Sequence, residues 1–498
     1  MALHNEEEEE EEPHVLMVAF SAQGHLNPML RLGKRLISHG LHVTIATTHL
    51  QPGRRLFKPS SSSTTARDIE FLFYSDGLDG RKVDLDTFMD SLSQHGPTNL
   101  TKLIHQNYHT APADANNSTG TRKTRRRRRL CCIVSNTFVP WAAYVAHDLG
   151  IPCAMLWIQP VALYAVYYRY YRNLNPFPTL TDPDLTVNLP GLPPLRTEDL
   201  PSFVLPTNTF GAFSKLFSEM FGAMEKHASW VLANSFHALE ADVIINSSKD
   251  LFPVVPVGPL VDPSLLGKGE EEEADGAVNL WEVDHSCMEW LDEQAAGSVV
   301  YVSFGSLATL SADQSASLEM ALKEGRWPFV WVVKGTEAGE LSSSSGGGQG
   351  IVVAWAPQTK VLAHRAVGCF VTHGGWNSTL EAVAAGVPMV VYPQWSDQPT
   401  NAKLVEDVFG VGVRVRANGD GKIVIGSEEM GRAIREVMDG PKSEQIKGNA
   451  RRLKIAAGEA VAGGGEGTSE VSVRKFVDEI IGRSCSSSGP CCGREGIS

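Results

Sequence analysis

The segment CFVTHGGWNSTLEAVAAGVPMVVY, residues 369–392, contains the pattern that decides the fold. Its apolar start, 369–371, predicts a strand, and two glycines then lead into a helix beginning near Ser378 and a second strand over 389–392. The same alternation continues around it, with predicted strands at 299–304 and 329–333 and predicted helices beginning near Ser311 and Asn401. Alternating strands and helices predict a parallel α/β domain in the C-terminal half of the chain.

The N-terminal half shows the same alternation. Apolar runs predict strands covered on both faces of a parallel sheet, at 15–20, 41–46, 131–134 and 153–156. We predict a helix after the first strand, with Asn27 as its N-cap and Pro28 as its first residue, and another helix over 141–149. The fold class is therefore α/β, with two Rossmann-like doubly wound domains that face a cleft.

Length and composition divide the chain further. A chain of 498 residues is too long for one hydrophobic core, and a stretch rich in Pro, Gly and acidic residues near its middle marks a linker. We expect an acidic disordered N-terminus at 1–12, a first domain at 13–253, a linker at 254–277 and a second domain at 278–465. A C-terminal helix at 466–482 is expected to pack back on the first domain, and a disordered tail follows at 483–498. The stretches 114–129 and 342–350 are interpreted as loops.

Charge and cysteine content exclude several classes of protein. With 57 acidic and 44 basic side chains the net charge is -13, which argues against nucleic acid as a partner. The arginine run 125–129 is of the kind found in nuclear-localisation or RNA-binding patches, but we interpret it as a solvated loop. Glutamates fill positions 6–12, where a secretory leader would be basic and then apolar, so we expect a cytoplasmic location. No apolar run is long enough to span a membrane, and sparse cysteines predict neither a zinc site nor disulfides.

The glycines after the strand 369–371 predict an anion site. His373, Gly374 and Gly375 allow a close approach of the backbone, and Asn377 and Ser378 follow at the N-terminus of a helix, whose dipole favours negative charge. A pyrophosphate fits this chemistry without a metal ion. Glycines before a helix are also common as ordinary turn residues, so the loop alone does not decide between the two readings.

The longer stretch 355–398 decides it, because it resembles the donor-binding box of plant secondary-product glycosyltransferases. It matches in length, in its opening Trp-Ala-Pro-Gln, in its central His-x-Gly-Trp-Asn-Ser and in its closing Asp-Gln, and departs at Gly374, where cysteine is common. The resemblance implies a GT-B fold, with the acceptor bound by 13–253 and the UDP-sugar by 278–465. We expect a monomer that needs no cofactor, with UDP-glucose as co-substrate and a small-molecule acceptor as its partner.

The resemblance also implies a role for each donor-side residue. Trp355, beside Ala356, stacks on the uracil, Gln358 bonds the ribose region, and Glu381 holds the ribose hydroxyls. The phosphates are assigned to His373, Asn377 and Ser378, with Ser306 in a second phosphate-side loop. Asp397 and Gln398 read the sugar, Trp376 lies near it, and a final glutamine goes with preference for UDP-glucose.

His25 is the candidate general base. It lies in Gln-Gly-His-Leu-Asn-Pro, residues 23–28, directly after the first predicted strand, and the resemblance assigns it the acceptor's proton. Many relatives pair this histidine with an aspartate in a segment ending Phe-x-Pro-Trp, whereas here the segment 135–141 has Asn136 at that position. An amide carbonyl orients an imidazole but does not stabilise its charged form as a carboxylate does. An acceptor that is already ionised loses the least catalytic rate by this change, because it has no proton to give up. The change therefore favours carboxylic acids over phenols.

Two further segments, 200–203 and 395–403, look like the branch that contains glucose-ester-forming enzymes and anthocyanin 5-O-glucosyltransferases. We therefore predict an inverting UDP-glucose-dependent glucosyltransferase acting on a small plant phenolic, such as a flavonoid, anthocyanin or phenylpropanoid, or on an aromatic or hormone carboxylic acid. C-glucosylation of a polyphenol and UDP binding without catalysis are the alternatives. Candidate acceptor-pocket aromatics are Phe88, Trp141, Trp157, Tyr164 and Phe203.

Overall fold

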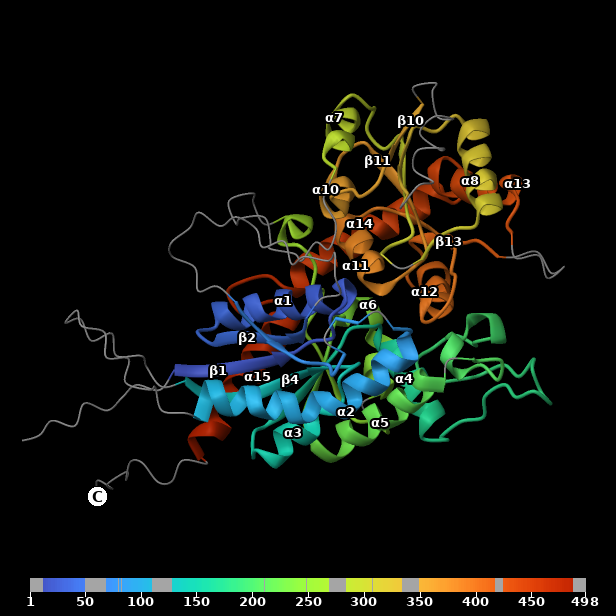
Figure 1. The fold of residues 1–498 in the computed structure, drawn as a ribbon. Coiled ribbons are helices and arrows are strands. Elements are labelled where there is room, and N and C mark those ends of the chain that lie inside the picture. Colours follow the sequence, from blue (N-terminus) through green and yellow to red (C-terminus); the bar gives the residue numbers. More distant parts are fainter. Residues whose placement is uncertain are drawn as a thin grey trace, which may run out of the picture.

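The structure, a computed structural model, describes residues 12–49, 69–109, 128–267, 284–333, 349–416 and 424–486, apart from positions 79, 82, 210, 248 and 307. The described elements form two α/β domains stacked one on the other (Figure 1), each built on a fully parallel sheet. The predicted α/β class with two doubly wound sheets is confirmed.

The N-terminal sheet has seven parallel strands in the order β3-β2-β1-β4-β5-β6-β7. Its strands are β1 Glu12–Val18, β2 His42–Thr48, β3 Glu70–Tyr74, β4 Arg128–Asn136, β5 Cys153–Trp157, β6 Ala228–Ala233 and β7 Val254–Pro256. Its helices are α1 Gln23–Ser38, α2 Leu85–Ile104, α3 Ala142–Asp148, α4 Val161–Tyr171, α5 Gly211–His227 and α6 His237–Ser247, and short helical turns lie at His105–His109, Thr197–Asp199, Ser202–Val204 and Pro263–Leu266. The central strands are apolar and buried because helices cover both faces (Figure 1).

The C-terminal sheet has six parallel strands in the order β10-β9-β8-β11-β12-β13. Its strands are β8 Val299–Ser303, β9 Phe329–Val332, β10 Gly350–Val353, β11 Val367–Thr372, β12 Met389–Val391 and β13 Gly412–Arg414. Its helices are α7 Ser286–Asp292, α8 Ala312–Gly325, α10 Gln358–Ala363, α11 Trp376–Ala385, α12 Gln398–Lys403, α13 Ser427–Met438 and α14 Ser443–Ala460, with a π-helical turn at Leu404–Val408.

Strand order fixes where a ligand can bind. In the N-terminal sheet the order reverses between β1 and β4, and in the C-terminal sheet it reverses between β8 and β11. Loops that leave the carboxyl ends of such strands diverge to opposite faces and open a crevice. The predicted residues His25, Asn136, Ser306 and His373 all follow or end one of these four strands, so both crevices contribute to the site.

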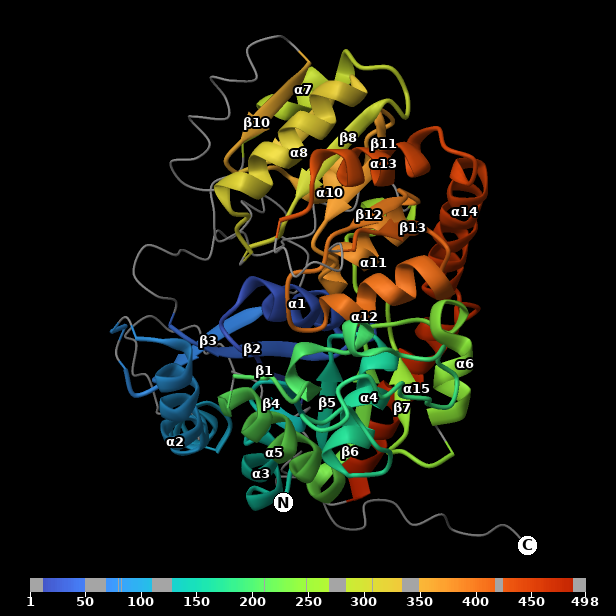
Figure 2. The same ribbon diagram turned by 90° about the vertical axis from the view of Figure 1, so that its right-hand side faces the viewer.

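The last described helix, α15 Thr468–Ser486, returns to the N-terminal domain (Figure 2). Its apolar side chains, among them Val473 and Phe476, belong to the same buried cluster as residues of α1 and β1. Glu470 pairs with Arg35 of α1 at 2.8 Å, and Glu479 accepts a hydrogen bond of 2.7 Å from the indole of Trp230. The N-terminal core is therefore completed by the C-terminal end of the described chain.

The helix after the first strand differs from the prediction. It begins at Gln23, with Ala22 as N-cap, so Asn27 is not the cap, Pro28 lies inside the helix, and His25 stands in its first turn. A proline within a helix donates no hydrogen bond to the carbonyl four residues earlier. That carbonyl, of Gly24, instead accepts a hydrogen bond of 2.8 Å from Asn377 of the other domain. The proline thus serves a contact between domains.

Several predicted boundaries also shift. Glu12 is the first residue of β1, and the start of the predicted linker, 254–256, is strand β7. The end of the predicted loop 114–129 belongs to β4, where Arg128 pairs with Glu70 at 2.6 Å, and Gly350 begins β10. The start of the predicted tail at 483 is still in α15. Residues 1–11, 114–127, 342–348 and 487–498 of the predicted loops and ends lie outside the described residues.

Candidate donor and acceptor site

One large cavity, of about 980 Å³, lies between the two domains and is lined by both. Every residue predicted for the donor contributes to its wall, namely Ser306, Trp355, Ala356, Gln358, His373, Trp376, Asn377, Ser378, Glu381, Asp397 and Gln398. His25 and Phe203 line it from the N-terminal domain. Helix α1 of one domain and helices α11 and α12 of the other lie where the domains meet (Figure 1). The cavity has room for a nucleotide sugar and a second small molecule.

His25 is held by Asn136, which ends strand β4. The Oδ1 atom of Asn136 lies 2.7 Å from Nδ1 of His25 and also accepts the backbone N–H of Phe138 at 3.2 Å. Because the backbone donor identifies Oδ1 as the oxygen, Nδ1 of His25 must carry the proton. The lone pair of the imidazole is then on Nε2, which is the atom that a general base uses.

The surroundings of His25 keep it neutral. The ring centroids of Phe138 and Phe20 lie 4.4 Å and 5.0 Å from that of His25. Burial lowers the pKa of His25 to about 4, and the hydrogen bond with Asn136 raises it only in part. Asn136 is fully buried, and within the described part of the chain its Nδ2 has no hydrogen-bond partner. An asparagine therefore orients the imidazole at this position without supplying the charge that would raise its pKa.

The side of the cavity that is predicted to take the phosphates is built from backbone. Gly374 has a φ of 83°, a conformation that residues with a Cβ rarely adopt, and the N-cap Gly375 offers no side chain to the first turn of α11. The amides of that turn are consequently available to an anion, together with the positive end of the helix dipole. Gly305, after β8, faces the imidazole of His373.

Gly305→Ala is expected to weaken UDP binding about tenfold. A Cβ at this position would lie 2.6 Å from Cε1 of His373 and would also be strained at φ 70°, so the ring must move. Gly40→Ala is the matched control, because Gly40 has a φ of 88° and no atom within 4 Å of the added Cβ. Both variants should lose similar thermal stability. Titration calorimetry with UDP checks the result, and equal UDP affinities for the two variants would contradict it.

A polar network crosses the domain boundary among the residues predicted to bind the ribose. Gln358 donates to Glu381 Oε2 at 2.7 Å and to Ser378 Oγ at 3.1 Å. Arg31, on α1, contacts Glu381 Oε1 at 3.4 Å and donates to the carbonyl of Leu260 at 3.1 Å. Arg31 and Glu381 are only 6% and 7% exposed. The carboxylate predicted to hold the ribose is thus paired with a cation from the acceptor domain.

Two residues of the donor box use their side chains between the domains. The indole N–H of Trp376 donates to the carbonyl of Asn234 at 2.8 Å, and the side chain is 3% exposed. Asn377 donates to Gly24, as described above. In this arrangement both side chains help to hold the two domains together.

Asp397 and Gln398, which are predicted to bind the sugar, stand at the start of helix α12. Asp397 accepts a hydrogen bond of 2.8 Å from Asn401, and burial raises the pKa of its carboxyl. The Oε1 atom of Gln398 accepts the backbone N–H of Gln394 at 2.8 Å and of Trp395 at 3.2 Å. This orientation leaves the Gln398 amide nitrogen as the group that can donate to a sugar hydroxyl.

The aromatic residues predicted for the acceptor pocket divide into four groups. Phe203 lines the large cavity together with Phe20 and Phe138. Phe88 is not on its wall but packs edge-on against Phe20, with ring centroids 5.7 Å apart. Trp157 and Tyr164 do not line it either, and for these two the prediction is wrong. Both are fully buried, and their polar atoms bond the carbonyls of Pro160 and Phe252.

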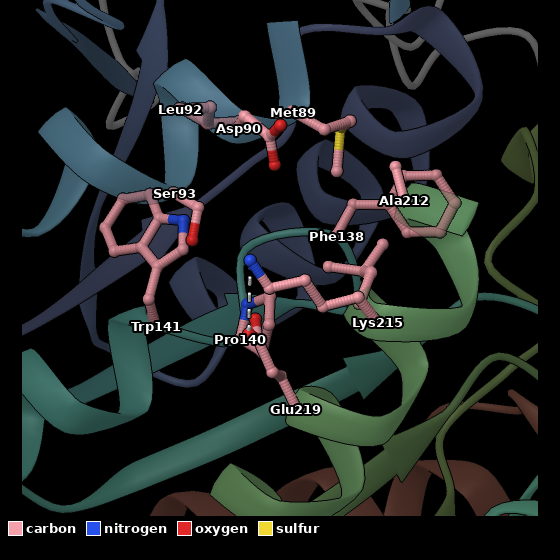
Figure 3. Close-up of a pocket in the computed structure, with 11 residues that line it drawn as sticks. Met89, Asp90, Leu92, Ser93, Phe138, Pro140, Trp141, Ala212, Lys215 and Glu219 are labelled. Atoms are coloured by element: carbon pink, nitrogen blue, oxygen red, sulfur yellow. Dashed lines mark ion pairs between the residues drawn. The ribbon is translucent and has the colours of Figure 1, made fainter. Parts of the chain in front are cut away.

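Trp141 also does not line the large cavity. It belongs to the wall of a smaller cavity, of about 20 Å³, whose lining residues come from α2, the segment after β4 and α5 (Figure 3). Phe138 lines both cavities. A volume of this size holds about one water molecule, so it cannot admit an acceptor.

Residues that the sequence prediction did not include also reach the cavity, and Arg31 is the most informative. It interrupts the apolar run of α1, whose neighbours Leu30 and Leu32 are buried. A charged residue in such a run needs a counter-charge when the helix packs, which is a signal readable from sequence. Its partner Glu381 interrupts the apolar run of α11 in the same way, although neither run identifies the partner of its charged residue.

The chain is similar to known proteins in sequence. A family profile described as "UDP-glucoronosyl and UDP-glucosyl transferase" matches residues 275–455. UDP-glycosyltransferase 84B1 of Arabidopsis thaliana is 43% identical over 482 residues, which are 95% of this chain and 98% of that protein. The chain belongs to the plant UDP-glycosyltransferases of family 1. The resemblance predicted from residues 355–398 is confirmed, and the chain is a UDP-glycosyltransferase.

Further similarities agree with this assignment. Gallate 1-beta-glucosyltransferase 84A24 of Punica granatum is 37% identical over 493 residues, covering 95% of this chain and 89% of that protein. Both relatives carry the group number 84, so the glycosyltransferase lies in that branch. The solved structure of Os79 from O. sativa in complex with UDP is 32% identical, has a TM-score of 0.80, and covers 94% of this chain and 100% of that chain. The predicted GT-B fold is confirmed.

The predictions about membranes, metal ions, location, oligomeric state and partners form a separate group. Among the described residues, no helix is both long enough and apolar enough to cross a membrane. Within the same residues, no group of three or more His, Cys, Asp or Glu side chains is placed to hold a metal ion. The cytoplasmic location, the monomeric state and the absence of a nucleic-acid partner remain expectations.

Proposed function

We propose that this glycosyltransferase is an inverting, UDP-glucose-dependent enzyme whose preferred acceptors are aromatic carboxylic acids, which it converts to glucose esters. The observation that carries the proposal is the pairing of His25 with the neutral carbonyl of Asn136, at 2.7 Å, in surroundings that lower the pKa of the imidazole to about 4. Similarity to a relative named gallate 1-beta-glucosyltransferase supports the same acceptor class.

The pKa of His25 separates the two acceptor classes. A phenol has a pKa near 10, so proton transfer to an imidazole of pKa about 4 is uphill by about 8 kcal/mol. A carboxylic acid with a pKa of about 4–5 is already ionised at neutral pH, and no proton needs to leave it. Its oxygen attacks the anomeric carbon directly, and the imidazole then contributes position rather than basicity.

The donor side is proposed to work as follows. Trp355 and Ala356 hold the uracil, Gln358 and Glu381 the ribose, and Asp397 and Gln398 the glucose. As the bond between the anomeric carbon and the phosphate oxygen breaks, negative charge grows on UDP. In the proposal the first-turn amides of α11 stabilise that charge together with His373, Ser378 and Ser306, which line the same cavity. Attack from the opposite face inverts the anomeric configuration.

An acceptor assay tests the proposal. Purified enzyme would be given UDP-glucose with matched pairs of compounds. Each pair consists of a hydroxybenzoic or hydroxycinnamic acid and the corresponding phenol that lacks the carboxyl group. We expect kcat/KM to be at least tenfold higher for the acids, and the products to release glucose in mild alkali, as esters do. Alkali-stable O- or C-glucosides as the main products would overturn the ester assignment, and UDP binding without turnover would overturn the enzymatic one.

A further inference from the structure

The two segments that resemble the glucose-ester-forming branch, 200–203 and 395–403, lie against each other across the domain boundary. Ser202 begins the helical turn Ser202–Val204 of the N-terminal domain, and Ser396 lies between β12 and α12 of the C-terminal domain. The backbone N–H of Ser202 donates to the carbonyl of Ser396 at 2.9 Å. In return the backbone N–H of Ser396 donates to Oγ of Ser202, also at 2.9 Å.

Ser396 has an unusual backbone conformation. Its φ of 62° lies in the left-handed region, which costs a residue with a Cβ about 1 kcal/mol or more. Both of its backbone polar groups are bonded to Ser202, which offsets that cost. Asp397 and Gln398 follow directly, so the direction in which the chain enters α12 depends on this contact.

Neighbouring contacts brace the pair. Asp199, which is 2% exposed, bonds Arg414 and lies 3.6 Å from Nζ of Lys403. Its backbone carbonyl accepts a hydrogen bond of 2.7 Å from Thr400. Each of these three partners belongs to the C-terminal domain, so the loop that carries Ser202 is fixed to the domain that holds the donor.

The sugar end is linked to the phosphate loop as well. The Nδ2 atom of Asn401 donates both to Asp397 and to the carbonyl of Gly374, each at 2.8 Å. A displacement of the segment 396–398 would therefore change the positions of Asp397 and Gln398 first. On the other side of the loop, Phe203 lines the cavity and meets Trp395 edge-on, with ring centroids 6.2 Å apart.

We propose that Ser202 is a positioning residue that sets the placement of Asp397 and Gln398, and through them the affinity for the hexose of the UDP-sugar and the selectivity among hexoses. The inference rests on the proposed function, because it takes these two residues as the sugar readers. It also joins acceptor and donor recognition, since Ser202 and Phe203 are adjacent and move together.

A contact that only holds the domains together would behave differently from a positioning contact. Its loss would lower stability, and it would weaken UDP and UDP-glucose equally. Loss of a positioning contact would weaken UDP-glucose alone, because UDP carries no hexose for Asp397 and Gln398 to bind. The ratio of the two dissociation constants therefore separates the two roles, and it needs no acceptor.

The experiment measures Kd for UDP and for UDP-glucose by titration calorimetry, in the absence of acceptor. For Ser202→Ala we expect UDP affinity within about twofold of wild type and UDP-glucose affinity lower by about fivefold to tenfold, the effect of one hydrogen bond plus relaxation of Ser396. With an aromatic acid as acceptor, the preference for UDP-glucose over UDP-galactose in kcat/KM should fall by a similar factor.

Controls keep the outcome decisive. Ser202→Thr retains the hydroxyl and should restore the UDP-glucose affinity, whereas Ser472→Ala, on α15, removes a serine hydroxyl far from the cavity and should change neither constant. Ser202→Cys, with a weaker acceptor atom, decides the matter if the alanine variant does not fold. Equal weakening of both ligands, or no change in either, would overturn the role of Ser202 and leave the proposed function intact. Failure of the wild-type enzyme to bind either ligand would overturn both.

Discussion

Replacement of His25 by alanine is expected to lower kcat/KM for a phenol by about 10²–10⁴-fold, while the value for an aromatic carboxylic acid falls by less than about tenfold. The phenol needs a base for its proton, and His25 presents its Nε2 lone pair because Asn136 holds the proton of Nδ1. The carboxylate needs no base. Initial rates with both acceptor classes measure the difference, and equal losses for the two would contradict the assignment.

Asn136→Asp is expected to have the opposite effect, because it makes His25 a stronger base. A carboxylate at this position stabilises the protonated imidazole, so the pKa of His25 should rise from about 4 towards its ordinary value. The stronger base should raise phenol turnover by about tenfold near neutral pH. The acid side of the pH profile for phenols, which follows protonation of His25, should move to higher pH by the same amount as the pKa. Asn136→Ala serves as the control, since it removes the orienting oxygen without adding charge, and a profile that does not move in Asn136→Asp would count against the mechanism.

Glu381→Ala is expected to have the second large effect, a loss of UDP affinity of about 10²-fold with a fall in the free energy of unfolding of about 3 kcal/mol. Two ribose hydroxyls lose a charged acceptor, and Arg31, which is 6% exposed, loses the carboxylate that it contacts at 3.4 Å. Titration calorimetry gives the affinity, and denaturant unfolding gives the stability. Glu428→Ala, at an exposed position of α13, is the control and should change neither quantity.

A double variant separates the two parts of that effect. In Glu381→Ala with Arg31→Met the buried guanidinium is removed together with the carboxylate that it contacts, so stability should recover in large part while UDP affinity stays low. Recovery of both quantities would mean that Glu381 acts by holding Arg31, and not by binding the ribose.

The strands were predictable from sequence because both sheets are parallel and buried. Apolar runs such as 131–134 and 153–156 lie within β4 and β5, since helices cover both faces and no polar alternation is needed. Helix α1 was misplaced for a local reason. Asn27-Pro28 is a common helix start, but here the helix begins one turn earlier and Pro28 leaves the Gly24 carbonyl to Asn377. A contact between residues so distant in sequence leaves no local pattern.

The site was predictable where one continuous segment builds it. Residues 355–398 supply most of the cavity wall that comes from the C-terminal domain, so the resemblance of this one segment to the donor-binding box of a known family could indicate it. The acceptor wall comes from side chains on separate elements, and an aromatic residue at a strand end, such as Trp157, faces the core as readily as a cavity. The pairing of Ser202 with Ser396 could not be inferred from either segment by itself, because it depends on how the two domains dock.

Helix α15 has a consequence for how the protein is made. Its side chains Val473, Phe476, Val477 and Ile480 complete the apolar cluster that contains Leu32 and Leu36 of α1. During synthesis the first domain leaves the ribosome long before this helix, so its buried face stays open to water until α15 has been made. The N-terminal domain can therefore complete its folding only after the second domain has been synthesised, and a shortened chain that lacks α15 should expose this cluster to chaperones and aggregate, even though every cavity-lining residue is present.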